Sequence, residues 1–155
     1  MRELIVKPEL FSFDTFEEFV QEFKVGPEDL IITNEYILGE YLITRKLEAT
    51  VFFQETCGMG EPSDEMFGRM LQKLGNLSKY HRIMGIGGGT VLDLSKLLVL
   101  KHCDQIEKLF NREIPLEREK ELILIPTTCG TGSEVTNISI LSFVEKQIKM
   151  GLAAD

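Results

Sequence analysis

Residues 82–96 read RIMGIGGGTVLDLSK, and this stretch decides the fold. It begins as an apolar run typical of a buried strand, passes through three consecutive glycines and continues with the pattern of an apolar helix. Glycines between a strand and a helix leave backbone N–H groups open beside the positive end of the helix dipole. The stretch therefore predicts a pyrophosphate-binding turn formed by Gly87, Gly88, Gly89 and Thr90.

A second stretch, residues 121–136, repeats this arrangement and reads ELILIPTTCGTGSEVT. An apolar run typical of a strand leads into hydroxyl residues and glycines. A triple glycine alone is a weak signal, because an ordinary turn can contain it. Two such loops, each after a predicted buried strand, are poorly explained as ordinary turns. Neither loop is the dinucleotide fingerprint that follows a first strand, and neither contains a Walker lysine. The pair indicates a nucleotide-binding domain of another type.

The rest of the chain alternates strands with helices. Apolar periodicity predicts strands at 30–33, 49–54, 82–86 and 121–126, helices at 13–23, 35–42, 62–77, 90–100 and 104–110, and a hairpin of 137–143 with 148–152. Strands separated by helices form a parallel sheet whose ligands lie at the carboxyl ends of the strands. We expect an α/β fold, with residues 1–155 forming one nucleotide-binding domain.

Three helix starts have predicted caps, and Ser63 is the predicted cap of the helix at 62–77. Asp14 is the predicted N-cap of the first helix. Thr90 and Asp93 have the spacing of a capping box. Asp93 therefore has two interpretations, a helix cap or a hydrogen bond to a sugar or amide of the ligand, and the residues favour neither.

Composition excludes several classes. The formal net charge is −8 and basic residues do not cluster, which argues against nucleic acid and an anionic membrane as partners. No apolar run approaches the roughly 20 residues of a membrane span, and the N-terminus lacks a signal-peptide core, so we expect a cytoplasmic protein. The three cysteines and two histidines have no metal-ligand spacing. We expect no metal ligand and no catalytic residue within this chain.

The two loops together resemble the nucleotide-loop motifs of the iron-dependent alcohol dehydrogenase family. The motif residues stand at 87–96 and 126–136, in the same order and spacing. Residues 60–65 and 129–139 most resemble the 4-hydroxybutyrate dehydrogenase branch, which interconverts 4-hydroxybutyrate and succinate semialdehyde with NAD. The resemblance implies that residues 1–155 form a Rossmann-like dinucleotide-binding domain. It also implies a small alcohol or aldehyde substrate and the possibility of a homodimer.

The resemblance also implies roles for individual residues. Gly88, Gly89 and Thr90 would hold the pyrophosphate of NAD, and Asp93 would lie near its nicotinamide end. Further cofactor contacts are implied for Thr127, Thr128, Thr136 and Lys149. Lys149 would reach the nicotinamide ribose, whereas the residues alone favour a solvated strand lysine at this position.

One position departs from the family pattern. Many relatives carry an aspartate after the strand at 30–33, where it holds the adenosine ribose and repels the 2′-phosphate of NADP. This chain has Asn34 there, followed by Glu35. Asn34 is the predicted ribose contact, and the preference for NAD is expected to be weaker.

The family's iron(II) is held by an aspartate and three histidines in a helical domain that this sequence does not contain. The resemblance therefore implies that this 155-residue chain binds the cofactor and has no catalytic activity by itself. Two alternatives stay open. One is a zinc enzyme similar to glycerol dehydrogenase or dehydroquinate synthase, and the other is a non-catalytic nucleotide-binding module.

Overall fold

The computed structural model describes residues 8–154 and contains one sheet of four parallel strands. The strand order is β2–β1–β3–β4. The strands are β1 (Asp29–Thr33), β2 (Thr50–Phe53), β3 (Arg82–Gly87) and β4 (Glu121–Pro126). Each pair is parallel, so all four carboxyl ends lie at the same edge. The predicted α/β class with a parallel sheet is confirmed.

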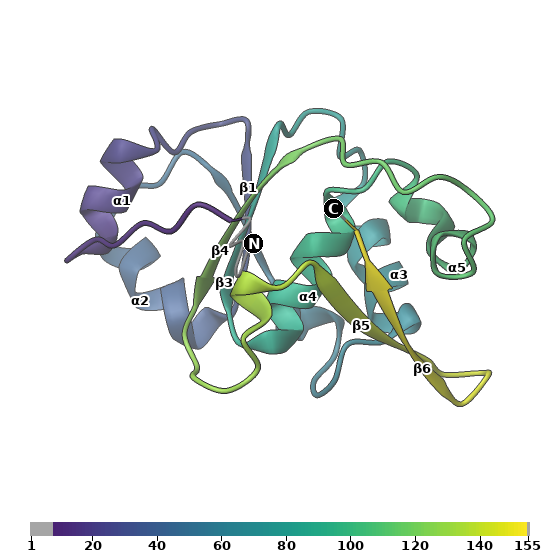
Figure 1. Cartoon of the computed structure of the whole chain (residues 1–155). Helices are drawn as coiled ribbons and strands as arrows, with labels where there is room; N and C mark the ends of the chain where they lie inside the picture. The colour runs from purple at the N-terminus through teal and green to yellow at the C-terminus, as the bar shows by residue number, and fades with distance from the viewer. Residues whose placement is uncertain (1–7, 155) are drawn as a thin grey trace, which may run out of the picture.

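Helices cover both faces of this sheet (Figure 1). On one face lie α1 (Phe16–Glu22) and α2 (Glu35–Thr44). On the other lie α3 (Asp64–Leu74), α4 (Gly89–Leu98) and α5 (Ile106–Phe110). Short 3-10 turns are η1 (Gln54–Cys57), η2 (Cys103–Gln105) and η3 (Ser133–Val135). No helix among residues 8–154 is long and apolar enough to cross a membrane.

The central strand β1 is buried along its whole length. Because successive strand residues point to opposite faces, β1 contributes to two apolar clusters. Ile31 packs with Phe19 and the α1–α2 layer. Leu30 and Ile32 pack with Leu94 and the α3–α4 layer. The sheet is therefore the middle layer of three, which explains why its strands read as nearly continuous apolar runs.

The predicted hairpin is confirmed as β5 (Ile138–Phe143) paired antiparallel with β6 (Ile148–Ala153). Its buried residues Leu141, Phe143 and Leu152 belong to the same apolar cluster as α4. Figure 1 shows α4 between the sheet and this hairpin. That position accounts for the apolar composition of the helix that follows the glycines.

Two helix ends differ from the sequence prediction. The N-cap of α1 is Thr15 and not Asp14: the Thr15 hydroxyl accepts from the Glu18 N–H at 3.2 Å, and the Asp14 N–H donates to the Glu18 carboxylate at 3.1 Å. A threonine followed three residues later by glutamate is a capping box, and it overrides the lone aspartate. Helix α3 starts after Ser63 as predicted but ends at Leu74, before Leu77.

Candidate functional site

The two loops meet at the carboxyl edge of the sheet. Strands β3 and β4 are neighbours, with Gly87 opposite Pro126. The N–H of Thr127 donates to the carbonyl of Gly87 at 3.1 Å. A Cβ added to Gly89 would lie 3.1 Å from the methyl group of Thr131. The glycine turn and the second loop are therefore adjacent, as the order of the strands requires.

The glycines of the first loop serve different purposes. A Cβ at Gly85 would lie 2.5 Å from the Ser95 hydroxyl, and one at Gly87 would lie 2.9 Å from the Val91 side chain. These two glycines let β3 pack closely against α4. A Cβ at Gly88 would meet nothing nearer than the Thr128 hydroxyl, at 3.5 Å. Packing within the chain therefore leaves room for a Cβ at Gly88, in ordinary van der Waals contact with Thr128.

Gly85→Ala is expected to destabilise the fold by about 2 kcal/mol, because the added methyl group must displace Ser95 on α4. Gly88→Ala is expected to lower stability much less, since its methyl group would make only ordinary contacts. Urea denaturation of both variants measures the difference. If the two variants were equally stable, the conclusion that Gly85 is tightly packed and Gly88 is not would be contradicted.

Helix α4 begins with an N-cap that has no side chain. The N-cap is Gly88, and no side chain caps the helix there. The predicted capping box of Thr90 with Asp93 is therefore wrong. Thr90 lies inside the first turn, and its hydroxyl donates to the carbonyl of Gly60 at 2.9 Å. The glycines allow the helix to start earlier than the threonine, and the amides of the first turn face a position suited to an anion.

Asp93 holds the second loop and the hairpin against α4. One carboxylate oxygen accepts from the Ser133 hydroxyl, and the other accepts from the N–H of Ile140 at 3.2 Å. The hydroxyl of Ser139 donates to the Asp93 carbonyl at 3.2 Å. The structure thus gives Asp93 a role that neither interpretation of the sequence included.

Lys96 is a buried cation beside Asp93. Its Nζ donates to the Ser133 hydroxyl and the Ile138 carbonyl, both at 2.7 Å. It also lies 3.3 Å from Asp93 Oδ1 and 3.3 Å from the Thr136 hydroxyl. Burial lowers the pKa of Lys96, although the negative charge of Asp93 opposes the shift. This one side chain joins the helix, the second loop and the start of β5.

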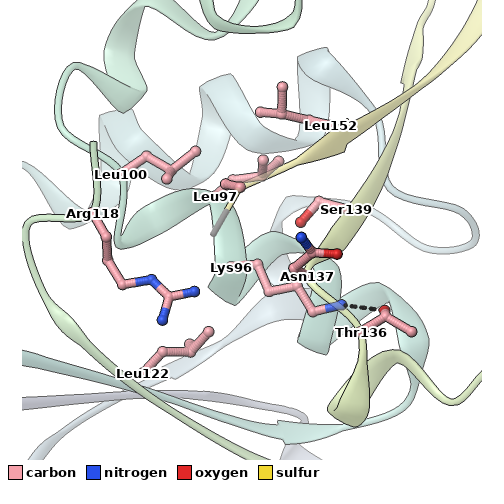
Figure 2. A pocket seen from close by; sticks show the side chains of 10 residues that line it. Lys96, Leu97, Leu100, Arg118, Leu122, Thr136, Asn137, Ser139 and Leu152 are labelled. Atoms are coloured by element: carbon pink, nitrogen blue, oxygen red, sulfur yellow. Dashed lines mark hydrogen bonds between the residues drawn. The ribbon is translucent and has the colours of Figure 1, made fainter. Parts of the chain in front are cut away.

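Figure 2 shows the bond from Lys96 to Thr136, with Asn137 and Ser139 nearby. These residues line a small cavity between α4, β4 and the hairpin, together with Leu97. Its volume is about 20 Å³, enough for roughly one water molecule. A dinucleotide does not fit there, so the open carboxyl edge is the candidate cofactor site.

Two glycines of the second loop, Gly130 and Gly132, have positive φ angles that other residues rarely adopt. Gly132 has φ of 63°, a left-handed conformation that side chains rarely adopt, and it begins η3. This turn places Ser133 in the buried position where it bonds to Lys96. Thr127 and Thr128, which precede the turn, are exposed. The loop therefore presents its first hydroxyls outward and anchors its far end.

Lys149 lies on β6 and forms an ion pair with Glu61 at 2.6 Å. Glu61 follows Gly60, whose carbonyl accepts from Thr90. The loop around these two residues therefore connects Lys149 with the start of α4. The contact between Lys149 and the nicotinamide ribose remains a prediction.

Asn34 is at the end of β1, buried, and begins α2. Its side-chain amide donates to Gln54 Oε1 at 3.3 Å and to Glu55 Oε2 at 2.9 Å. The N–H of Glu35 donates to Glu55 Oε1 at 2.6 Å. The end of the neighbouring strand β2 therefore brings a carboxylate to the predicted ribose contact.

Sequence reasoning assigned no role to Lys96, Ser133 or Glu55. Lys96 follows Asp93 by three residues, a spacing that places both on one helix face. This was the available signal for Lys96. No sequence signal pointed to Glu55, because it approaches Asn34 only through the pairing of β1 with β2.

The cysteines and the acidic groups show no metal centre. Cys57, Cys103 and Cys129 are free, and burial raises the pKa of the Cys103 thiol to about 11. Cys103 is therefore a neutral core residue at physiological pH. Within residues 8–154, no three His, Cys, Asp or Glu side chains are arranged to hold a metal ion.

The family model for iron-containing alcohol dehydrogenase matches residues 10–155, which is almost the whole chain. This chain belongs to the iron-containing alcohol dehydrogenase family. The resemblance carried by the two loops is confirmed, and both loops lie inside the matched region.

Among curated relatives in this family, a 4-hydroxybutyrate dehydrogenase from Clostridium kluyveri is 45% identical over 155 residues. The alignment covers 100% of this chain and 42% of that relative. A long-chain-alcohol dehydrogenase from Geobacillus thermodenitrificans is 46% identical over 69 residues, covering 41% of this chain and 18% of that protein. The chain thus spans less than half the length of these two relatives.

Solved structures of the family share the fold. The sulfoacetaldehyde reductase of Bifidobacterium kashiwanohense, solved in complex with NAD+, aligns with a TM-score of 0.67 at 20% identity. The alignment covers 90% of this chain and 38% of that structure. At this identity the likeness shows the fold alone, and it confirms the Rossmann-like domain expected of an iron-containing alcohol dehydrogenase.

Proposed function

We propose that this chain is the NAD-binding part of a longer, iron-dependent oxidoreductase that interconverts a primary alcohol and an aldehyde. The observation that carries the proposal is the turn at Gly88. A Cβ at Gly88 would make only ordinary contacts with Thr128, no side chain caps α4, and the second loop lies alongside. An open helix N-terminus with bare amides fits a pyrophosphate.

The cofactor residues follow from this placement and from the family motifs. Gly88, Gly89 and Thr90 bind the pyrophosphate, and Asp93 and Lys96 position the second loop beside it. Bound NAD supplies hydride transfer, and iron(II) held outside this chain supplies a Lewis acid for the alcohol oxygen. The proposed cofactor contacts are Asn34, Gly87, Gly88, Gly89, Thr90, Asp93, Thr127, Thr128, Thr136 and Lys149.

The proposed substrate pair is 4-hydroxybutyrate and succinate semialdehyde. Its support is the 45% identity to the 4-hydroxybutyrate dehydrogenase of Clostridium kluyveri along the full length of this chain. The solved reductase bound to NAD+ supports the choice of cofactor. The cytoplasmic location and the homodimer expected from the sequence remain predictions.

The complete protein is expected to reduce NAD with 4-hydroxybutyrate, and the 155-residue chain alone is expected to show no turnover, even with added iron. The reason is that residues 8–154 provide no metal centre. The absorbance of NADH measures the activity of the complete protein and of the 155-residue chain. Metal removal followed by iron(II) or zinc(II) addition identifies the metal that restores activity.

Two outcomes would contradict the proposal. Steady turnover by the 155-residue chain would place catalysis within these residues. A complete protein that oxidises other primary alcohols but not 4-hydroxybutyrate would contradict the substrate assignment while leaving the cofactor assignment intact.

A further inference from the structure

Glu55 occupies an unusual position at the carboxyl edge of the sheet. Strands β1 and β2 run side by side, with Thr33 opposite Phe53, so the residues that follow them meet. Glu55 follows β2, and its carboxylate accepts from the Asn34 side chain at 2.9 Å and from the Glu35 N–H at 2.6 Å. A negative charge is thereby held where β1 ends and α2 begins.

The contacts around Glu55 fix its side chain in place. Asn34 also donates to Gln54, and Gln54 in turn donates to the carbonyl of Gly58 at 2.9 Å. Glu55 is half-buried, and the N-terminus of α2 favours a carboxylate. A carboxylate accepts about four hydrogen bonds, so the two from Asn34 and Glu35 leave capacity for a ligand hydroxyl.

The position of this carboxylate relative to the glycine turn fits the adenosine end of a dinucleotide. Strand β1 lies next to β3, which carries the glycine turn. In dinucleotide-binding domains an acidic residue at the end of a neighbouring strand bonds to the ribose and disfavours a 2′-phosphate. Asn34 is neutral and cannot supply that repulsion.

We propose that Glu55 supplies the negative charge that makes this site prefer NAD to NADP. The inference rests on the proposed function, and it names the residue that sets the cofactor preference. Glu55 reaches the end of β1 from β2 and accepts a ribose hydroxyl while repelling a 2′-phosphate. Asn34 positions Glu55 through its side-chain amide.

Glu35 is the competing source of charge, and its geometry differs. Its side chain is exposed, and its Cγ lies 3.1 Å from where a Cβ on Gly39 would stand. The Glu35 side chain therefore runs along its own helix. Only its backbone N–H takes part in the contacts at the end of β1.

The test compares Glu55→Gln with Glu35→Gln in the complete protein, each removing one charge. Dissociation constants for NADH and NADPH are measured by fluorescence titration, which needs no catalysis. We expect Glu55→Gln to lower the ratio of the NADPH constant to the NADH constant about tenfold, mainly by tightening NADPH binding. Glu35→Gln and the exposed control Glu113→Gln are expected to change it less than about twofold.

The outcomes separate the two proposals. If the wild-type protein binds neither nucleotide, the proposed function fails and this inference fails with it. If it binds NADH but Glu55→Gln leaves the ratio unchanged, only the role of Glu55 is overturned. Should Glu55→Gln fail to fold by circular dichroism, Glu55→Ser tests the same loss of charge, and Glu55→Asp should retain the preference for NADH.

Discussion

Gly88→Val is expected to weaken NAD binding about 100-fold while the protein stays folded. The valine side chain would occupy the position beside the start of α4 that the proposal assigns to the pyrophosphate, where a Cβ would make only ordinary contacts with Thr128. Gly88 has φ of −80° and extended ψ, so the backbone accepts a valine without strain. The lost affinity corresponds to roughly 3 kcal/mol, which is two tenfold steps in the dissociation constant.

Calorimetric titration with NAD measures this loss, and urea denaturation checks the fold. The change of N-cap residue should cost at most about 1 kcal/mol in stability. Gly68→Val is the matched control, since a Cβ on Gly68 in α3 meets nothing within 4 Å. An unchanged affinity for NAD in folded Gly88→Val protein would refute the assignment of this turn.

Lys96→Met is expected to destabilise the fold by about 3 kcal/mol and to weaken NAD binding. Methionine has a similar length but leaves the partly buried carboxylate of Asp93 without its counter-charge. Ser133, Thr136 and the Ile138 carbonyl also lose a donor. The second loop should then separate from α4, and the cofactor should lose one side of its site.

Urea denaturation and NAD titration measure the two effects. The control is Lys101→Met, which removes an exposed ion pair with Glu117 and should cost less than about 1 kcal/mol. The double variant Asp93→Asn/Lys96→Met should recover part of the stability, because no unpaired charge remains. A Lys96→Met protein as stable as the Lys101→Met control would show that this contact does not hold the loop.

The strands of the sheet could be predicted from sequence because helices cover both faces of the sheet, and β1 and β3 are buried along almost their whole length. The runs at 30–33, 82–86 and 121–126 are almost entirely apolar, and the structure places β1, β3 and β4 on them. The hairpin followed from the alternation in 137–143, which one buried face explains. The meeting of the two loops followed from the rule that parallel strands end at one edge.

The helix starts were harder, because competing caps lie close together in sequence. Asp14 and Thr15 are both good N-cap residues, and the glutamate three positions after Thr15 decides between them. At α4 the glycines allow the helix to begin before Thr90, so the hydroxyl that looked like a cap bonds to Gly60. Local preference predicts that a helix begins nearby but does not fix the residue.

The polar contacts that position the site could not be predicted, because they join distant parts of the chain. Lys96 reaches the second loop only because the hairpin folds back over α4. Glu55 reaches Asn34 only because β2 pairs with β1. The motifs therefore predicted which residues contact the ligand, and the structure added the residues that hold those loops in position.

A crystal structure of the complete protein with NAD+ tests the central claim most directly. We expect the pyrophosphate to accept hydrogen bonds from the backbone amides at Gly88 and Gly89, with the second loop alongside and the adenosine ribose near Glu55. A pyrophosphate bound elsewhere on the sheet, with the turn at Gly88 facing solvent, would contradict the account.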